Sequence, residues 1–243
     1  MKKHSGLILC IFTVCLVSAL SFLYWSNVKE RLIAASGISA VSAPLSSVSI
    51  TSRTLALTFD VDSDSGDITE LLAALDANQT KATFFITGKW LDANPDLVKA
   101  IAENGHELGN HTEDHIDMTT LTEKEQVNQI VFLHHKVLDL TGISMTLFRP
   151  PFGACDYSVI QTAHRNDYLA ITWSLDSHDW KDYSAHDIVT TITNSGNLGS
   201  GAILLFHASG SNTVEALKEL IPLLRGKDYS FASVSELISL RQD

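Results

Sequence analysis

Thr54-Leu-Ala-Leu-Thr-Phe59 is a short apolar run that stops at the carboxylate of Asp60. A run of this kind is typical of a strand that is buried on both faces in a parallel sheet. Similar runs recur along the chain, and segments with helical periodicity separate them. Further strands are expected near residues 82–87, 106–109, 145–148, 168–175, 202–206 and 229–232. About seven strand–helix units predict an α/β fold with a parallel sheet, either open or closed into a small barrel.

The segments between these runs carry the start and stop signals of helices. Pro95, with Asn94 before it as a cap, predicts the start of a helix that ends at Gly105. Thr122-Glu-Lys-Glu125 opens a long helix, which we expect to end before Gly142. Other helices are expected near residues 68–75, 158–165, 188–194, 213–224 and 234–240.

Polar residues follow the ends of several predicted strands. These residues are Asp60, His111, Arg149, the stretch Asp176–Asp179 and His207. In parallel α/β folds, the carboxyl ends of the strands meet at one edge, and the functional site is built there. The sequence therefore predicts that these side chains share one site.

His111 and His115 are four positions apart, which places both imidazoles on one side of a helical turn. Two neutral imidazoles with a carboxylate and open water positions suit Zn²⁺, and also Co, Ni or Mn. Asp60 and Asp62 supply two carboxylates, of which one can bind metal while the other removes a proton from water. The alternatives are two surface histidines and a plain polar loop, because residues 62–66 are all turn formers.

An acid and two supporting groups can be proposed from the later motifs. Arg149 begins a rigid proline turn and can pair with Asp60, which would hold that carboxylate ionised. His207 can serve as a general acid, oriented by a carboxylate from Asp176–Asp179. The indole of Trp180 can form a wall of the pocket. A buried structural histidine and a surface arginine are the alternatives.

Together these residues resemble the polysaccharide deacetylases, the NodB homology domain of carbohydrate esterase family four. The resemblance covers residues 53–240 and rests on five motifs in order: Thr58-Phe59-Asp60, His111-Thr-Glu-Asp-His115, Arg149-Pro-Pro-Phe152, Asp176-Ser-His-Asp179-Trp180 and Leu205-Phe-His207. Five ordered motifs are far more specific than any one of them. The resemblance implies a distorted (β/α) barrel of about seven parallel strands that holds one divalent metal ion.

The resemblance also implies a role for each matching residue. The implied catalytic residues are the base Asp60, its partner Arg149, the acid His207 and Asp179, which tethers the acid. The implied metal ligands are His111 and His115. The implied substrate-binding residues are Phe152, through its backbone N–H at the oxyanion, and Trp180, which lines the pocket.

The opening motif departs from the family at Val61, where a second Asp usually supplies the third metal ligand. A pattern of Asp-x-Asp would make Asp62 that ligand, and Asp64 is a weaker candidate. If neither carboxylate reaches the metal, the affinity for metal falls. Phe152 stands where Tyr is commoner, which matters less because the family's contact there is through the backbone.

The N-terminus differs from the rest of the chain. Residues Leu7–Trp25 form 19 positions without a charge, which is long enough to cross a hydrocarbon layer about 30 Å thick. The two lysines before this stretch favour an N-terminus in the cytoplasm and a domain outside the membrane. We expect a signal anchor at 1–26, a linker at 27–52 and the catalytic domain at 53–243. A cleaved signal peptide, which would make the protein secreted, is the alternative.

Composition narrows the possible partners. The net charge of −11 disfavours nucleic acid, because phosphate binding needs clustered Lys and Arg. Only Cys155 lies in the predicted domain, so no disulfide can form within it. We expect a monomeric catalytic domain whose partners are an N-acetylated glycan polymer and the membrane.

The predicted function is metal-dependent hydrolysis of N-acetyl groups on an amino-sugar polymer, with release of acetate. A location outside the membrane favours peptidoglycan N-acetylglucosamine as the substrate, and chitooligosaccharide is the second candidate substrate. An O-acetyl esterase acting on a xylan-like glycan would use the same residues. A non-catalytic, cell-surface glycan-binding domain is the other alternative; Val61 favours it, and the full set of catalytic residues opposes it.

Overall fold

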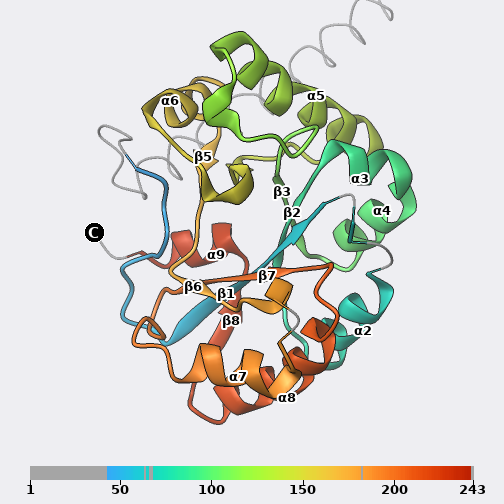
Figure 1. Ribbon diagram of the computed structural model, residues 1–243. Coiled ribbons are helices and arrows are strands. Elements are labelled where there is room, and N and C mark those ends of the chain that lie inside the picture. The colour runs from blue at the N-terminus through green and yellow to red at the C-terminus, as the bar shows by residue number, and fades with distance from the viewer. Residues whose placement is uncertain (1–42, 63, 66–67, 182, 242–243) are drawn as a thin grey trace, which may run out of the picture. The chain divides into compact units, whose positions relative to one another are not determined.

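Strand β1 (Thr54–Val61) lies at the centre of the sheet in the computed structural model, which describes residues 43–62, 64–65, 68–181 and 183–241. All eight residues of β1 are buried. It pairs in parallel with β2 (Thr83–Ile86) on one side and with β7 (Ile203–His207) on the other (Figure 1). Burial on both faces explains the continuous apolar run, because neither face of this strand meets water.

The sheet is a half-barrel of parallel strands. The remaining strands are β3 (Glu107–Asn110), β4 (Leu147–Phe148), β5 (Leu169–Ala170), β6 (Leu175–Asp176) and β8 (Ser230–Ala232). Seven strands follow the order β5-β4-β3-β2-β1-β7-β6, and β8 pairs with the start of β1. Within the described ranges no pairing joins β5 to β6, so the barrel stays open between these two strands.

Helices cover the outside of this sheet. The α-helices are α2 (Thr69–Ala77), α3 (Gly88–Ala93), α4 (Pro95–Glu103), α5 (Glu123–Thr141), α6 (Tyr157–Arg165), α7 (Ala185–Thr193), α8 (Thr213–Arg225) and α9 (Val234–Ser239). Three short 3₁₀ helices are η1 (Met118–Thr120), η2 (Pro151–Gly153) and η3 (Asp179–Lys181). Figure 1 shows α5 and α6 on one side of the strands and α7 and α8 on the opposite side.

The helix boundaries follow local chemistry. The predicted capping box is present, because Thr122 accepts from the backbone N–H of Glu125 and the Glu125 side chain accepts from Thr122. Gly142 ends α5 in the left-handed conformation, with φ of 74°. Pro95 begins α4 and Asn94 is its N-cap residue, both as predicted, but the Asn94 side chain makes no capping hydrogen bond. The Asn94 side chain donates instead to the carbonyl of Trp90, at the end of the preceding helix α3.

The single strand expected over residues 168–175 was also wrong. The chain splits there into β5 and β6, which lie at opposite ends of the strand order. Between them Ile171 pairs with Leu45, and the Leu45 N–H donates to the carbonyl of Ala170 at 2.8 Å. The apolar run is continuous because it crosses the open side of the half-barrel, where an upstream segment covers it.

That upstream segment precedes the domain boundary expected at Arg53. Besides Leu45, it includes Ser47, which pairs with Ala202 beside the start of β7. Among the residues that the structure describes, no helix has the length and apolar character needed to span a membrane. The predicted span at Leu7–Trp25 and the cleavage alternative lie outside the described residues, so both remain predictions.

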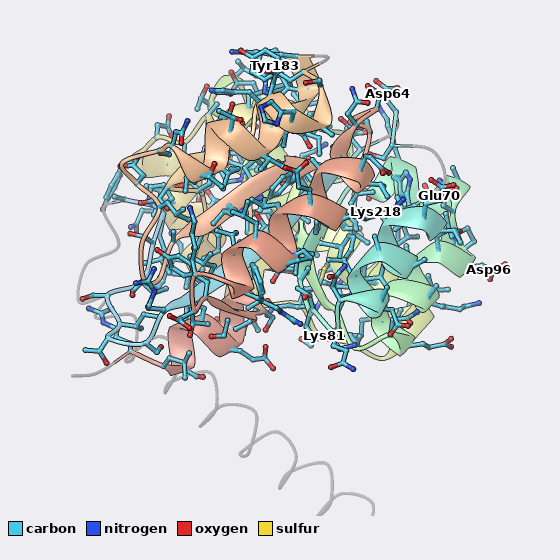
Figure 2. The ribbon with its side chains drawn as sticks, turned by 90° about the horizontal axis from the view of Figure 1, so that it is seen from below. Asp64, Glu70, Lys81, Asp96, Tyr183 and Lys218 are labelled. Carbon is cyan, nitrogen blue, oxygen red and sulfur yellow. The ribbon has the colours of Figure 1, made fainter. Side chains whose placement is uncertain are left out.

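The core brings the strand ends into register. The rings of Phe59 and Phe84 stack with centroids 5.1 Å apart, and Phe206 packs on the other side of Phe59 at 5.7 Å. Because these three rings belong to β1, β2 and β7, their packing stabilises the pairing of these neighbouring strands. Figure 2 shows Asp64, which follows β1, at one margin of the ribbon and Lys81, which precedes β2, at the other. The carboxyl ends of the strands therefore share one edge.

Candidate active site

Strand register places the candidate base and acid directly beside each other. Asp60, near the end of β1, is the Cα partner of His207, at the end of β7. On the other side of β1, Asn110 at the end of β3 pairs with Phe148, and the next residues are His111 and Arg149. Four of the predicted site residues thus follow from the pairing of parallel strands, as their shared placement predicted.

Asp60 forms a buried ion pair with Arg149. The Arg149 Nη1 donates to Asp60 Oδ1 at 2.7 Å, and only 8% of Asp60 and none of Arg149 is exposed. Burial by itself raises the pKa of Asp60, but the charge of Arg149, with smaller electrostatic contributions from His111 and His207, outweighs it. The pKa of Asp60 therefore lies below its ordinary value, and this carboxylate is ionised at neutral pH.

Aromatic faces enclose the Arg149 guanidinium. Its carbon lies 4.1 Å from the centroid of Phe85 and 5.6 Å from that of Trp173, and Nη2 donates to the carbonyl of Thr172 at 3.2 Å. Gly109 makes room for this stack, because a Cβ there would lie 2.5 Å from the Phe85 ring. The predicted pairing of Arg149 is present. Its aromatic neighbours were missed, because apolar residues in strands give no signal of the cation they cover.

The position and protonation of His111 suit it to ligate a metal ion. Its Nδ1 lies 2.7 Å from the backbone carbonyl of Arg149, which can only accept, so Nδ1 carries the proton. Its Nε2 is buried without a hydrogen-bond partner and lies 3.4 Å from Asp60 Oδ2. Burial lowers the pKa of His111 to about 4, which keeps the ring neutral at pH 7. A neutral imidazole with one free, oriented nitrogen is the form that ligates metals.

His115 lies beside His111, but the helical turn predicted for this stretch was wrong. Residues 111–117 form an irregular loop in which Thr112 and His115 have left-handed φ values of 73° and 57°. The two imidazole centroids nevertheless lie 4.9 Å apart. Burial lowers the pKa of His115, and the carboxylate of Asp62 is the strongest charge that opposes this effect. The two histidines are close together as predicted, but an irregular loop brings them together and not a helical turn.

His111 and His115 supply two imidazole donors of the kind that suits a divalent metal, and the loop that begins at Asp62 offers carboxylates for a third. Within the described ranges, no group of three or more His, Cys, Asp or Glu side chains is placed closely enough to hold a metal ion. Asp62 Oδ1 accepts from the backbone N–H of Asp64 at 3.1 Å and from the Ser65 hydroxyl at 3.3 Å. Of the two candidates for the third ligand, Asp62 acts more strongly than Asp64 on His115.

His207 and Asp179 form the second charged pair of the site. His207 Nδ1 lies 2.9 Å from Asp179 Oδ1. Asp179 Oδ2 accepts from the backbone N–H of His207 and from the hydroxyl of Thr213. Burial lowers the pKa of His207, but the bond to Asp179 and the charge of Asp60 outweigh it, so the pKa lies above its ordinary value. Since Asp179 holds Nδ1, the transferable proton sits on Nε2. Of the carboxylates in Asp176–Asp179, the structure selects Asp179.

Two exposed aromatic residues lie close to these groups. Phe152 has a left-handed φ of 61° in η2, and its ring lies 4.8 Å from that of His115. Trp180 follows Asp179 in η3 and is 57% exposed. Their exposure suits contact with a large ligand. The oxyanion role of the Phe152 backbone N–H stays a prediction.

Thr213 and Gly210 are site residues that the sequence did not reveal. Thr213 is buried and donates to Asp179 Oδ2 at 2.7 Å. A Cβ on Gly210 would lie 2.1 Å from the Thr213 hydroxyl and 3.0 Å from Asp179 Oδ2. Both residues follow β7 within six positions of His207. That proximity was the only available signal.

Comparisons with known proteins agree with this geometry. A family model described as polysaccharide deacetylase matches residues 48–171. The peptidoglycan-N-acetylglucosamine deacetylase PgdA of Listeria monocytogenes is 36% identical over 213 residues, which are 87% of this chain and 44% of that protein. A peptidoglycan-N-acetylglucosamine deacetylase of Bacillus cereus is 34% identical over 191 residues, which are 76% of this chain and 88% of that protein. The chain thus spans less than half the length of the Listeria protein.

A solved structure adds a contrasting relative. It is a Bacillus anthracis protein described as a pseudoenzyme of carbohydrate esterase family four, and its TM-score is 0.78 at 27% identity. The match covers 84% of this chain and 72% of that one. A mutant of the same protein is described as having restored enzymatic activity. This fold therefore exists in forms with and without catalysis.

Proposed function

The chain belongs to the polysaccharide deacetylase family, and we propose that it removes N-acetyl groups from a cell-surface amino-sugar polymer and releases acetate. The observation that carries this proposal is the pairing of Asp60 with His207 across β1 and β7. The pKa of Asp60 lies below its ordinary value and that of His207 lies above it. Two adjacent groups whose pKa values are pushed apart are suited to be the base and the acid of one reaction.

The chain's own residues can divide the work of amide hydrolysis. Asp60, held ionised by Arg149, accepts the proton of the attacking water. His207 donates its Nε2 proton to the departing nitrogen, and Asp179 stabilises the imidazolium before that transfer. A divalent metal at His111 and His115 supplies, when bound, a lower pKa for the water and polarisation of the acetamide carbonyl. The backbone N–H of Phe152 is proposed to bind the oxygen that becomes negative.

Several finer points belong to the same proposal. The third metal ligand is Asp62, with Asp64 as the alternative, and the metal is Zn²⁺ before Co, Ni or Mn. The preferred polymer is peptidoglycan N-acetylglucosamine, which the printed names of the Listeria and Bacillus cereus relatives support. The domain is proposed to act as a monomer outside the membrane, to which the N-terminal segment anchors it. Trp180 is proposed to line the sugar pocket.

Acetate release together with metal content tests the proposal. The purified protein, reconstituted with Zn²⁺, is incubated with chitooligosaccharide, with peptidoglycan and with acetylated xylan. We expect acetate from the amide substrates, and a loss of at least about 100-fold in the variants Asp60→Asn and His207→Gln, since a positioned acid or base contributes about 10² to 10⁴. Acetate from xylan alone would identify an O-acetyl esterase instead.

A non-catalytic glycan-binding domain is the second candidate. The Bacillus anthracis pseudoenzyme favours it, together with Val61, which is fully buried and cannot ligate a metal. Against it, both charged pairs of the site are formed with hydrogen-bond lengths of 2.7 and 2.9 Å. A protein that binds oligosaccharide but holds no Zn²⁺ and releases no acetate would establish this second function.

A further inference from the structure

Asn110 is a fully buried polar residue at the end of β3 that has no part in the chemistry above. Its side chain makes three hydrogen bonds. Oδ1 accepts from the backbone N–H of Thr112 at 2.9 Å, and Nδ2 donates to the carbonyl of Ile130 at 2.8 Å and to the hydroxyl of Tyr168 at 3.3 Å. A buried amide with so many partners holds its neighbours in one arrangement.

The orientation of this amide is fixed by its partners. The Thr112 N–H can only donate and the Ile130 carbonyl can only accept, so Oδ1 must face the loop and Nδ2 must face α5. The Tyr168 hydroxyl also meets Nδ1 of His134 at 2.5 Å. Burial raises the pKa of Tyr168 beyond its usual range, so the hydroxyl stays protonated and available to both partners.

The hydrogen bond from Asn110 ends on Thr112, whose backbone conformation is energetically unfavourable. Thr112 has φ of 73°, a left-handed conformation that a β-branched residue rarely adopts and that costs of order 1–3 kcal/mol. Three bonds hold it there: its N–H to Asn110, its carbonyl to the Gly88 N–H at 3.0 Å, and its hydroxyl to the His115 N–H at 3.0 Å. Without them the chain would relax away from this turn.

The turn at Thr112 decides where the imidazole of His115 lies relative to that of His111. His111 precedes it and is held by the Arg149 carbonyl, whereas His115 follows it and is held through the Thr112 hydroxyl. The left-handed turn between them folds the loop back, so that the rings lie 4.9 Å apart although no helix connects them. A change in φ at Thr112 would move His115 while leaving His111 in place.

We propose that Asn110 is a positioning residue that pre-forms the two-histidine metal site by holding Thr112 in its left-handed turn. The proposal rests on the proposed function, because it concerns the metal that this function needs. Asn110 acts through Thr112 on His115 and touches neither metal nor substrate. The site is then built before metal arrives, and binding costs little rearrangement of the loop.

Zn²⁺ affinity is the quantity that tests this role. The full chain is titrated with Zn²⁺ alone against a chromophoric chelator, and Asn110→Ala is compared with the wild type. We expect affinity to fall about tenfold, which corresponds to roughly 1.4 kcal/mol of lost preorganisation. Asn166→Ala is the matched control, because it also removes an asparagine side chain that donates to a backbone carbonyl, here that of Thr162 at 2.8 Å. We expect this control to stay within about twofold of the wild type.

A double-mutant cycle separates positioning from general loss of stability. Glycine adopts positive φ readily, so Thr112→Gly removes the need for Asn110 to enforce the turn, and its loss of the hydroxyl that holds the His115 N–H is common to both arms of this background and cancels. We expect Asn110→Ala to lower Zn²⁺ affinity by less than about threefold in the Thr112→Gly background. An equal loss in both backgrounds, or no loss in the wild-type background, would overturn the proposal. If Asn110→Ala does not fold, Asn110→Ser fills part of the space and is measured in the same cycle.

The outcomes distinguish this proposal from the proposed function. A wild type that binds Zn²⁺ tenfold better than Asn110→Ala but releases no acetate supports the positioning role and refutes the function. A wild type that releases acetate while Asn110→Ala binds Zn²⁺ equally well refutes only the positioning role. A wild type that binds no Zn²⁺ overturns both.

Discussion

The acid pair of the site gives the sharpest prediction, for the substitution Asp179→Asn. In the wild type both carboxylate oxygens of Asp179 accept hydrogen bonds. Oδ1 accepts from the ring nitrogen Nδ1 of His207, and Oδ2 accepts from the backbone N–H of His207 and from the Thr213 hydroxyl. Asparagine has one oxygen and one NH₂ group. To keep both bonds at the Oδ2 position, it must turn its NH₂ toward His207 Nδ1. Protonated His207 would then bring an N–H against an N–H, so the neutral ring is favoured.

The magnitude follows from the bond that is lost. A hydrogen bond to a charged group is worth about 1.5–3 kcal/mol, which corresponds to roughly one to two pKa units for His207. The pKa of His207, raised above its ordinary value in the wild type, should therefore fall below it in Asp179→Asn. Because His207 must be protonated to act as an acid, the alkaline limb of the rate profile should move to lower pH, and kcat at pH 7.5 should fall by about 10- to 100-fold.

Two measurements check this prediction. The His207 ring is titrated by NMR in both proteins, and acetate release is measured from pH 5 to 9. Thr213→Val is the control, because it removes one donor to Asp179 Oδ2 while leaving the carboxylate charge on His207. It should shift the pKa of His207 little and leave kcat within about fivefold. An Asp179→Asn variant whose His207 titrates as in the wild type would refute the reasoning.

Three further changes probe the rest of the site. Arg149→Met removes the charge that lowers the pKa of Asp60, so the acid limb of the rate profile should move to higher pH, as acetate release between pH 4 and 7 would reveal. The stability that this ion pair contributes is present above the unfolded pKa of Asp60, about 3.9, and is lost as the pH falls through the lower folded pKa. The difference in the free energy of unfolding between wild type and variant should therefore shrink as the pH is lowered. Gly109→Ala places a Cβ 2.5 Å from the ring beneath Arg149 and should cost about 1–3 kcal/mol in the free energy of unfolding, whereas Gly142→Asn at a helix end should cost less than about 1 kcal/mol. Asp62→Ala should lower the Zn²⁺ content measured after dialysis, and Asp64→Ala should not. An Asp62→Ala variant with the same Zn²⁺ content as the wild type would exclude Asp62 as a ligand.

Much of the fold was predictable because strand burial and strand ends leave clear marks in the sequence. The apolar run of β1 and the polar residue that follows it both survive in the structure, since a parallel strand buried on both faces has little other composition available. The same rule failed at residues 168–175. An apolar run records burial, not hydrogen bonding: Ile171 and Leu175 are both buried, yet the chain between them passes from one edge of the sheet to the other.

The candidate site was predictable in its residues more than in its geometry. The prediction that His111 and His115 lie together was right, but its reason was wrong, because the turn between them depends on Asn110 and Thr112 rather than on a helix. Thr213 could not be assigned to the site, because a threonine at a helix start is common and nothing local distinguishes one that supports a carboxylate. Residues that act through tertiary contacts leave no periodic signal.

The geometry of β1 offers a physical reason for the unusual opening motif. Successive side chains of a strand point to opposite faces, so the side chain of Val61 faces away from the side to which Asp60 points. Val61 is fully buried in the core, where an ionised second aspartate would lack a partner. The strand continues through Val61, and Asp62 then begins the loop, half-buried on the side of the site. Because Val61 is turned into the core, Asp62 is the next carboxylate after Asp60 that can serve as the third ligand, and its charge acts on His115 more than that of any other acid.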